Sequence, residues 1–523
     1  MAKFDFKVRQ KLLALRKERP KSVHKKWVDF PTGLKALLTD LFTAGQLVLL
    51  AVLYAFFAWY FPIFFYVSIG LTVCAAVYVF ITERDSQSKA SWLFLFLISF
   101  GCGYIVYFLA DKRICYGFNR KRYVQIFNRS LPHIGEYKLQ NVTPAVACDC
   151  EYIYKSGGFV PYTGTDIKYF SDARKLFDNL IGRLEEAQDF IFIEYFIVSE
   201  GVLLERLIDV LRRKVAQGVE VRFLCDDVGC QGVLTSSTKK RIKAAGIKLK
   251  VFEKLFSLFS FGLNFRDHRK IIVIDGKTGY VGGCNIADEC TNQHRMEGLW
   301  KDAGVRLDGE AVDGLSLTFL RQWEFSTKEK CDYERYLRKA EKTESASTVV
   351  PYAGGPEITE YLCRGVYSNV LSAAHEKLYV MTPYLIPDGE LFAQIKAKAM
   401  SGVDVRIVLP SVPDYPFIYR VTRSNAERLM AYGVKIYFVK NTFVHSKVML
   451  TENCVTVGSV NLDMRAFYQE FDNGIYTDDK AVMSDAQDDF EKVFATNEQA
   501  TLAKHNVFSR FITAILRMVS PLM

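Results

Sequence analysis

The chain has 523 residues, half of them hydrophobic, and carries a formal net charge of +10 at neutral pH. Its length leaves room for two or three domains, and its hydrophobic share is high for a soluble enzyme. Its 12 cysteines lack the paired Cys-x-x-Cys spacing with histidine that a zinc site needs, which indicates reduced thiols and a cytoplasmic location.

An apolar region near the N-terminus predicts membrane spans. Residues 1–35 form a basic tail, and residues 36–111 then contain three apolar runs, at 41–60, 62–82 and 91–110. Each run is about as long as the ~30 Å hydrocarbon core of a bilayer requires. The alternative is one buried hairpin in a soluble domain. A cleavable signal peptide is not expected, because the basic tail is too long and one apolar run follows another.

Positive charges flank this region and bear on its topology. They precede it in the tail 1–35 and follow it at 112–122, so both ends favour the cytoplasmic side. Three full crossings would separate the ends, so we expect two to three spans, with either 91–110 or a tightly paired 41–82 failing to cross fully. The sequence thus predicts a multi-pass protein of the cell membrane with cytoplasmic catalytic lobes.

The same charges indicate a class of partner. Basic residues beside apolar spans attract anionic lipid headgroups, at about 1 kcal/mol each near the surface. Nucleic acid is the competing partner for a basic chain. Because the charge is clustered beside the apolar runs, we expect a lipid partner and no nucleic acid.

Residues 112–165 are expected to form a connector, which a first lobe at 166–345 follows. Apolar periodicity in this lobe predicts helices at 171–187, 203–216 and 236–245 and strands at 189–197, 219–225 and 247–252. A strand that carries His268, a turn at 275–277 and a strand that reaches Gly282 follow.

A second lobe is expected at 346–523, after a polar hinge near 340–356. It repeats the same order, with predicted helices at 357–373, 389–401 and 421–432, strands at 377–383, 404–409 and 434–439, and then a His445 strand and a strand that reaches Gly458. Alternating strands and helices predict α/β lobes with mostly parallel sheets covered on both faces. The apolar tail 507–523, with two arginines, fits either a segment that lies on the membrane or one that packs on the protein.

The two lobes are an internal repeat. Residues 218–224 (GVEVRFL) return as 402–408 (GVDVRIV), and residues 282–285 (GGCN) return as 458–461 (GSVN). The offset stays between about 176 and 187 residues, which indicates a duplicated domain and not a solenoid. A duplication with half a site in each copy predicts one active site at the interface between the copies.

The motif Asp267–Asp275 (DHRKIIVID) and its looser echo Val444–Glu452 carry the chemistry. The chain has seven histidines, and two of them, His268 and His445, stand two residues before a lysine at the start of an apolar run. A neutral imidazole can attack phosphorus to form a phosphohistidine, and a second imidazolium can protonate the leaving alkoxide.

Fixed donors must stabilise the negative charge that develops on the phosphoryl oxygens. The candidates are Lys270, Lys447, Asn285, Asn461 and Ser459. No carboxylate cluster has the spacing of a hard-metal site, so we expect neither a metal nor another cofactor.

A carboxylate on the second nitrogen of an imidazole would fix its tautomer. Each copy offers one downstream of its asparagine: Asp302 in the first, and Glu470 or Asp472 in the second. Either could instead be a solvated charge at a strand end.

These residues resemble the phospholipase D superfamily, whose signature is His-x-Lys-x4-Asp followed by Gly-(Gly/Ser)-x-Asn. Within it the chain is most similar to the bacterial cardiolipin synthases. The likeness rests on Phe265–Lys270, Asp414–Tyr419 and Asn461–Arg465, and on the N-terminal apolar runs. It implies two duplicated phospholipase D-like α/β/α lobes after a transmembrane helical region.

The resemblance also implies a reaction. One phosphatidylglycerol would be attacked by His268, with His445 as the acid, and a second phosphatidylglycerol would take the phosphatidyl group from the enzyme to give cardiolipin and glycerol. The motif acids Asp275 and Glu452 would complete the catalytic set by shaping the site. The second motif departs from the family pattern, because Glu452 replaces the usual Asp, the turn to Gly458 is one residue shorter, and Asp472 stands where Glu is commoner.

Two other readings remain. Water, serine or another alcohol as acceptor would make a phospholipase D hydrolase or a different phosphatidyltransferase. An inactive membrane scaffold is the third reading, although both histidines, both lysines and both asparagines are present.

Overall fold

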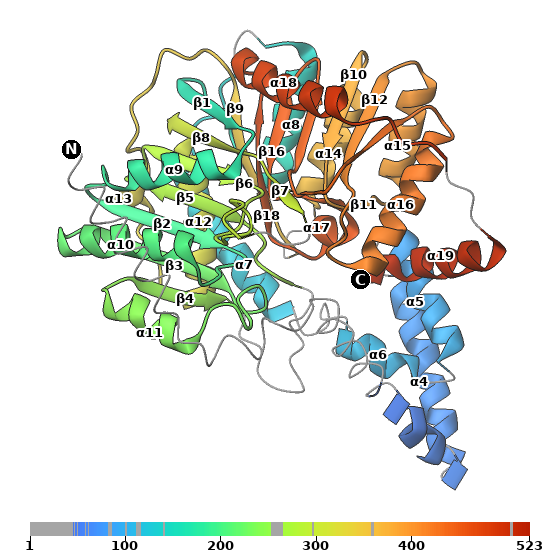
Figure 1. Ribbon diagram of the computed structural model, residues 1–523. Coiled ribbons are helices and arrows are strands. Elements are labelled where there is room, and N and C mark those ends of the chain that lie inside the picture. The colour runs from blue at the N-terminus through green and yellow to red at the C-terminus, as the bar shows by residue number, and fades with distance from the viewer. Residues whose placement is uncertain are drawn as a thin grey trace. The chain divides into compact units, whose positions relative to one another are not determined.

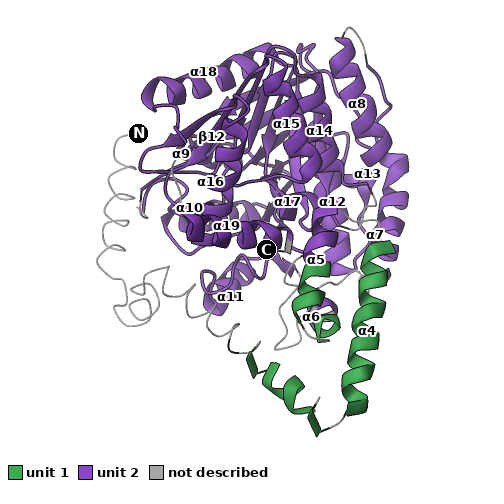
Figure 2. Cartoon of the chain, turned by 90° about the vertical axis from the view of Figure 1, so that its right-hand side faces the viewer, with its two compact units in different colours: residues 1–81, 93–106 green, residues 82–92, 107–523 purple. Residues whose placement is uncertain are grey.

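The structure is a computed structural model. It describes residues 45, 48–49, 51–57, 59–60, 62–81, 86–99, 102–110, 117–139, 142–252, 265–294, 298–356, 360–502 and 506–522. The chain divides into one unit of residues 1–81 and 93–106 and a second of residues 82–92 and 107–523 (Figure 2). The basic tail 1–35 lies outside the described residues.

Among the described residues, one helix has the length and composition to cross a membrane: α4 (Pro62–Ile81), which matches the second predicted run. The third run is divided between α5 (Ser86–Ile98) and α6 (Gly103–Ala110). A Cβ at Gly103 would come within 2.4 Å of the Ser99 hydroxyl, so close packing at this break requires glycine. The first run is only partly described, and a membrane region of two to three spans therefore stays a prediction.

The connector of the sequence prediction forms two helices that pack on the lobes (Figure 1). Helix α7 (Gly117–Ser130) lies against the first lobe, where Arg122 donates to the carbonyl of Glu324. Helix α8 (Pro144–Gly157) begins after Thr143, whose hydroxyl accepts from the Val146 N–H, and lies against the second lobe. The connector is thus part of the folded unit.

Each lobe contains one seven-stranded sheet. The strands of the first, in the order β1-β8-β6-β5-β2-β3-β4, are β1 (Thr165–Phe170), β2 (Phe190–Tyr195), β3 (Glu220–Asp226), β4 (Lys248–Phe252), β5 (Lys270–Ile274), β6 (Thr278–Gly282) and β8 (Gly304–Gly309). The strands of the second, in the order β13-β12-β10-β15-β16-β18-β9, are β9 (Val349–Gly354), β10 (Lys377–Met381), β12 (Asp404–Pro410), β13 (Lys435–Val439), β15 (Val448–Thr451), β16 (Val455–Gly458) and β18 (Asp472–Thr477).

The prediction of mostly parallel sheets is wrong. In the first sheet only β2 with β3 and β3 with β4 pair in parallel, and the other four pairs are antiparallel. The second sheet has the same mixture. The physical reason is that each motif strand turns back on itself as a hairpin and a return strand then extends the sheet, so half of each sheet is built without crossover helices.

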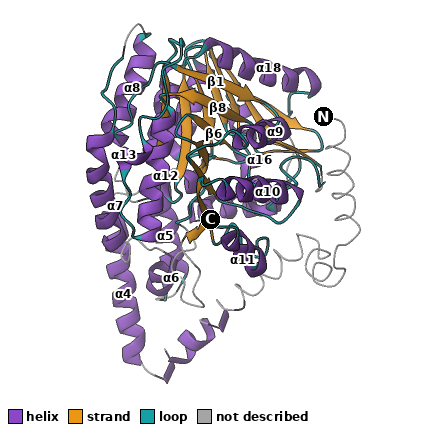
Figure 3. Ribbon diagram, turned by 90° about the vertical axis from the view of Figure 1, so that its left-hand side faces the viewer, coloured by secondary structure: helices purple, strands orange, loops and turns teal. Residues whose placement is uncertain are grey.

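Helices cover these sheets. In the first lobe they are α9 (Ala173–Leu184), α10 (Val202–Ala216), α11 (Ser236–Ala244), α12 (Val312–Thr327) and α13 (Tyr333–Tyr336). In the second they are α14 (Leu362–Ala373), α15 (Gly389–Met400), α16 (Pro416–Met430), α17 (Met464–Tyr468), α18 (Lys480–Thr496) and α19 (Val507–Val519). Figure 3 shows α9 and α10 on one side of the first sheet and α12 on the other.

Amphipathic patterning explains the outer helices. In α9 the leucines at helical spacing, Leu176, Leu180 and Leu184, are buried, and the Asp172 carboxylate accepts from two backbone N–H groups at the start of the helix. Helix α12 differs, because nearly every residue from Val312 to Phe325 is buried. It packs on both lobes, which share one hydrophobic core.

The predicted order of elements is otherwise confirmed in both lobes. The longer elements that the sequence analysis did not predict are β1, β8, β9, β18, α12 and α18. It also missed the short strands β7 (Leu299–Lys301), β11 (Leu385–Ile386), β14 (Thr442–Val444) and β17 (Leu462–Asp463) and the short helices α13 and α17. Strand β9 occupies the second half of the segment expected as the hinge. These elements belong to the edges and the interface of the lobes, so they decide how the two motifs face each other.

Candidate active site

Both motif histidines lie immediately outside a strand. His268 precedes β5, which begins at Lys270 and is buried along its length between β2 and β6. His445 follows the short strand β14 (Thr442–Val444) and precedes β15. Because the strands behind them are rigid parts of each core, the two imidazoles are held at fixed ends of their sheets.

Backbone pairing across the lobes aligns each histidine with a carboxylate of the other copy. Asp267 pairs in parallel with Phe471, and His268 donates its N–H to the Phe471 carbonyl at 2.9 Å. At the equivalent place β14 pairs with β7 (Leu299–Lys301), and His445 donates its N–H to the Lys301 carbonyl at 2.8 Å. The residue that follows each of these partners is an aspartate.

The two imidazoles are therefore oriented by exchanged carboxylates. His268 Nδ1 lies 2.9 Å from Asp472 Oδ1, and His445 Nδ1 lies 2.7 Å from Asp302 Oδ2. Glu470, the other predicted acid, is 3.7 Å from His268 Nδ1 and pairs with Arg465 instead. A carboxylate at Nδ1 keeps the proton there and leaves Nε2 with its lone pair, the form that can attack phosphorus.

Aromatic rings form the walls beside these imidazoles. The Phe196 ring stands edge-on to His268 with 5.1 Å between centroids. Trp300 and Phe443, from the two strands that pair across the lobes, lie 4.9 and 5.8 Å from His445. Both imidazoles are buried, so these walls limit access of water to the reacting nitrogens.

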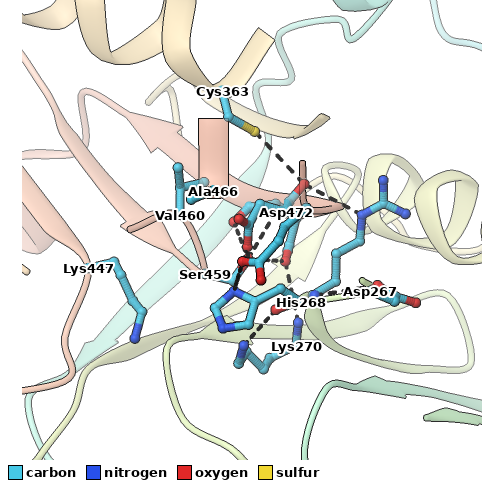
Figure 4. Close-up of polar contacts among 12 residues, drawn as sticks. Asp267, His268, Lys270, Cys363, Lys447, Ser459, Val460, Ala466 and Asp472 are labelled. Carbon is cyan, nitrogen blue, oxygen red and sulfur yellow. Dashed lines mark hydrogen bonds and ion pairs between the residues drawn. The ribbon is translucent and has the colours of Figure 1, made fainter. Parts of the chain in front are cut away.

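The two motif lysines complete a cationic centre. Lys270 Nζ donates to the His268 carbonyl at 2.6 Å, and Lys447 Nζ donates in the same way to the His445 carbonyl. Both side chains are buried, and Figure 4 shows that Lys447 points toward the His268 ring from the other lobe. Two ammonium groups beside two imidazoles form a binding place for a phosphodiester anion.

Burial and these positive charges keep both imidazoles neutral. Burial and Lys270 lower the pKa of His268 well below its ordinary value, and burial and Lys447 lower the pKa of His445 to about 4. The carboxylates differ. Burial raises the pKa of Asp472 to about 6, whereas at Asp302 the effect of burial is outweighed by His445 and Lys447, which hold its pKa below the ordinary value. Asp302 is thus the more firmly ionised partner.

The remaining predicted donors take different places. Asn285 and Asn461 are buried, and the amide oxygen of each has no hydrogen-bond partner among the described residues. Ser459 lies beside them in the repeat but donates to Asp472 at 2.6 Å. Ser459 therefore fixes an orienting carboxylate. The amide oxygens accept and cannot hold an anion, so only the NH2 groups of Asn285 and Asn461 could donate to a phosphoryl oxygen.

The motif acids are not brought to the imidazoles. Asp275 lies beyond the far end of β5 and accepts from the backbone N–H groups of Gln188, Asp189 and Phe190 at 2.7–2.9 Å. Glu452 follows β15 and accepts from the N–H groups of His375 and Lys377 in the same way. The prediction that Asp275 and Glu452 belong to the catalytic set does not match this geometry. Both carboxylates fasten a motif hairpin to the neighbouring strand, and Glu452, with its longer side chain, does so in the same way as Asp275.

This placement predicts that Asp275→Asn weakens the fold and spares the chemistry. Loss of the charge that three backbone donors share should lower the free energy of unfolding by about 1–3 kcal/mol. Thermal unfolding in detergent should show the loss, while activity per folded molecule stays near that of the exposed control Asp209→Asn. A folded but inactive Asp275→Asn protein would contradict this placement and would mean that the carboxylate takes part in the reaction.

A metal could in principle use some of the same side chains. Ligand atoms of His268, Glu470 and Asp472 lie within 4.8 Å of one another. Lys270 and Lys447 face this group, and their charges oppose a bound cation. The residues therefore fit an anion better than a metal ion.

The lysines predict an alkaline limit to activity. Burial and the nearby Lys447 lower the pKa of Lys270 to about 7, so its positive charge is lost as pH rises above that value. We expect kcat/KM to fall as pH rises above about 7, and to fall again below about pH 6, where Asp472 takes up a proton and no longer orients His268 as an anion. In Lys270→Arg, which keeps its charge, the remaining activity should lose this alkaline fall. An unchanged alkaline limb would assign it to another group.

Sequence reasoning missed a second buried layer behind the site. Arg269 lies between the motif residues, donates to the Gly354 carbonyl at 3.0 Å and lies 3.5 Å from Glu194. Both side chains are fully buried. The signal was present, because Glu194 is a charge in the middle of the apolar run 189–197.

Comparison with known proteins agrees with the duplication. A family model described as the PLD-like domain of cardiolipin synthase matches residues 180–307 and again residues 367–494. An uncharacterised protein of Streptococcus mutans is 33% identical over 471 residues, which cover 86% of this chain and 99% of the relative. A cardiolipin synthase of Listeria innocua is 29% identical, with 86% and 96% covered.

A solved structure shares the fold. The crystal structure of phosphatidylserine synthase from Haemophilus influenzae superimposes with a TM-score of 0.55 and 13% identity, covering 72% of this chain and all of that one. The family model and these relatives agree with the duplicated domain and the paired motifs. The chain therefore belongs to the phospholipase D superfamily and carries two PLD-like domains of the cardiolipin synthase type.

Proposed function

We propose that the protein is a cardiolipin synthase that transfers the phosphatidyl group of one phosphatidylglycerol to another. The observation that carries the proposal is the pair of buried imidazoles, each held through Nδ1 by an aspartate of the opposite lobe, between two lysines. This arrangement offers a nucleophile, an acid and an anion site in one place. The sequences of the cardiolipin synthases that it resembles support the choice of lipid.

In the first step, Nε2 of His268 attacks the phosphorus of a bound phosphatidylglycerol. A P–N bond forms, the P–O bond to the glycerol headgroup breaks, and His445 gives its proton to the departing glycerol oxygen. In the second step, the terminal hydroxyl of another phosphatidylglycerol gives its proton to His445 and attacks phosphorus. The P–N bond breaks, and cardiolipin leaves.

The difference between the carboxylates supports this division of roles. His445 is protonated only when a bound phosphodiester anion adds to the charge of the ionised Asp302, because both favour the imidazolium. His268 faces Asp472, whose pKa of about 6 means that it is less fully ionised than Asp302. His268 is therefore less readily protonated and stays neutral, as a nucleophile must. Lys270, Lys447 and the amides of Asn285 and Asn461 would hold the phosphoryl oxygens.

We further propose that the protein works at the cell membrane, with its lobes on the cytoplasmic side. Helix α4 and the basic residues around the apolar region support this arrangement. No step of the proposed reaction needs a metal ion, so activity should persist in the presence of a chelator.

The test is to incubate the membrane-embedded protein with phosphatidylglycerol alone and a chelator, and to identify the products. Cardiolipin and glycerol in equal amounts are expected. Phosphatidic acid in place of cardiolipin would indicate a hydrolase, and a product formed only with added serine or another alcohol would indicate a different transferase. Absence of any product would favour a scaffold.

A further inference from the structure

The C-terminal helix α19 (Val507–Val519) is attached to the second lobe by its polar side. Arg420 of α16 donates through its Nε to the Thr513 hydroxyl at 2.9 Å and through its Nη2 to the Ser509 hydroxyl and carbonyl at 2.9 and 3.0 Å. Ser509 and Thr513 are one helical turn apart, so they lie on one face. This face is the one that contacts the protein, and Figure 1 shows α19 across the end of α16.

The first part of the apolar side of the same helix is left uncovered. Val507, Phe508 and Phe511 are 82%, 72% and 61% exposed, and no residue of α19 is buried. Apolar residues continue along the helix at spacings of three and four residues, at Ile512, Ile515, Leu516 and Val519, and these are half-buried. A surface helix of a soluble domain normally turns such a stripe inward, so the exposed rings of Phe508 and Phe511 at the start of α19 depart from that pattern.

The surroundings of the stripe are basic. Helices α16 and α19 together contain five arginines (Arg420, Arg423, Arg428, Arg510 and Arg517) against one acidic residue, Glu427. An apolar stripe flanked by arginines matches an anionic bilayer surface, where the rings enter the acyl boundary and the guanidinium groups meet phosphates.

The helix that holds α19 begins close to the active site. Helix α16 begins two residues after Asp414, whose carboxylate accepts from Tyr384 and lies within the field of the catalytic Lys447. The next exposed aromatic residues, Tyr415 and Phe417, are both 55% exposed. Arg420, one turn further along α16, is the residue that holds α19, so both aromatic residues lie between Asp414 and the contact with α19.

A further contact ties the end of α19 to the first half of α5, within the same unit. The Ser91 hydroxyl of α5 donates to the carbonyl of Met518.

We propose that α19 is an interfacial anchor that lies in an anionic membrane surface, with Phe508 and Phe511 in the acyl boundary, and that it holds the mouth of the active site at the lipid headgroups. The part concerning substrate rests on the proposed function, since a lipid drawn from the bilayer needs a site that faces it. The occupant of the stripe is the bilayer itself and not a second copy of the chain.

The position of the helix can be tested without reference to activity. The full chain is reconstituted in nanodiscs of phosphatidylglycerol and phosphatidylcholine whose acyl chains are brominated near the headgroup, and Phe508→Trp is compared with Met400→Trp. Met400 is an equally accessible apolar residue, 66% exposed at the end of α15. The tryptophan added at 508 should be quenched by brominated lipid, and that at 400 should not.

A second variant tests the consequence for substrate. Phe508→Glu/Phe511→Glu should lower turnover of bilayer phosphatidylglycerol by about tenfold or more, because two charges replace the inserted rings. Turnover of a short-chain phosphatidylglycerol in free solution should stay within about twofold. Equal losses on both substrates would overturn the role in access.

The outcomes separate the two proposals. Equal quenching at positions 508 and 400 would overturn the anchor, as would a self-association that the double glutamate variant abolishes while quenching is absent. If the unaltered protein acts on neither form of phosphatidylglycerol, the proposed function fails, and the quenching result still decides where α19 lies.

Discussion

His268→Ala should abolish transfer with every substrate, whereas His445→Ala should still react with a phosphodiester that has a good leaving group. An alkyl leaving group needs a proton from His445, but a nitrophenolate leaves without one. With phosphatidylglycerol, both variants should lose at least about 10⁴-fold in rate. With a nitrophenyl phosphodiester, His445→Ala should release one equivalent of nitrophenol and accumulate a covalent phosphohistidine.

The matched control is His375→Ala, because His375 is an exposed histidine of the same lobe. Its activity should equal that of the unaltered protein with both substrates. A burst of nitrophenol from His268→Ala, and none from His445→Ala, would exchange the two assigned roles. Bursts from both variants would show that neither imidazole alone is the nucleophile.

Asp302→Asn should cost more activity than Asp472→Asn, although the two residues occupy equivalent places in the repeat. Asp302 is the firmly ionised partner of His445, and its removal leaves the imidazolium of the acid without a counter-charge. We expect a loss of about 10²–10⁴-fold with phosphatidylglycerol and a much smaller loss with the nitrophenyl substrate. Asp472→Asn should slow both substrates alike, because it disturbs the orientation of the nucleophile.

The Asp275→Asn variant is the control here, since it changes a motif carboxylate that does not contact an imidazole. Rates are compared per folded molecule, measured by thermal unfolding. If Asp302→Asn affected both substrates equally, the carboxylate would act by holding the fold of the site and not by supporting the acid.

Local patterns in the sequence predicted the alternating helices and strands of each lobe and the candidate residues His268, Lys270, His445 and Lys447. The duplication follows from the return of these short patterns later in the chain. These side chains do meet at one interface. Prediction succeeded where the signal lies within about ten residues.

Features that depend on distant segments could not be predicted. The exchange of Asp302 and Asp472 between lobes follows from two short strand pairings, Asp267 with Phe471 and β14 with β7, that join residues far apart in the chain. The mixed sheets depend on β8 and β18, which return after the motifs. A single sequence does not show which distant strands pair or in which register. Because each copy carries both a histidine and a downstream carboxylate, the sequence favoured pairing of the two within one lobe.

The motif acids show that nearness in the sequence does not ensure nearness in the fold. Asp275 and Glu452 are close to the histidines in sequence, but an extended strand carries each of them to the far end of the sheet. The family resemblance therefore grouped these acids with the histidines, whereas the strand geometry separates them.

The stereochemical course at phosphorus tests the central claim most directly. Phosphatidylglycerol made chiral at phosphorus with oxygen isotopes is converted by the membrane-embedded protein, and the configuration of the product is determined. Two successive in-line displacements, through a phosphatidyl group on His268, predict overall retention. Inversion would mean a single direct displacement and would contradict a covalent intermediate between the two imidazoles.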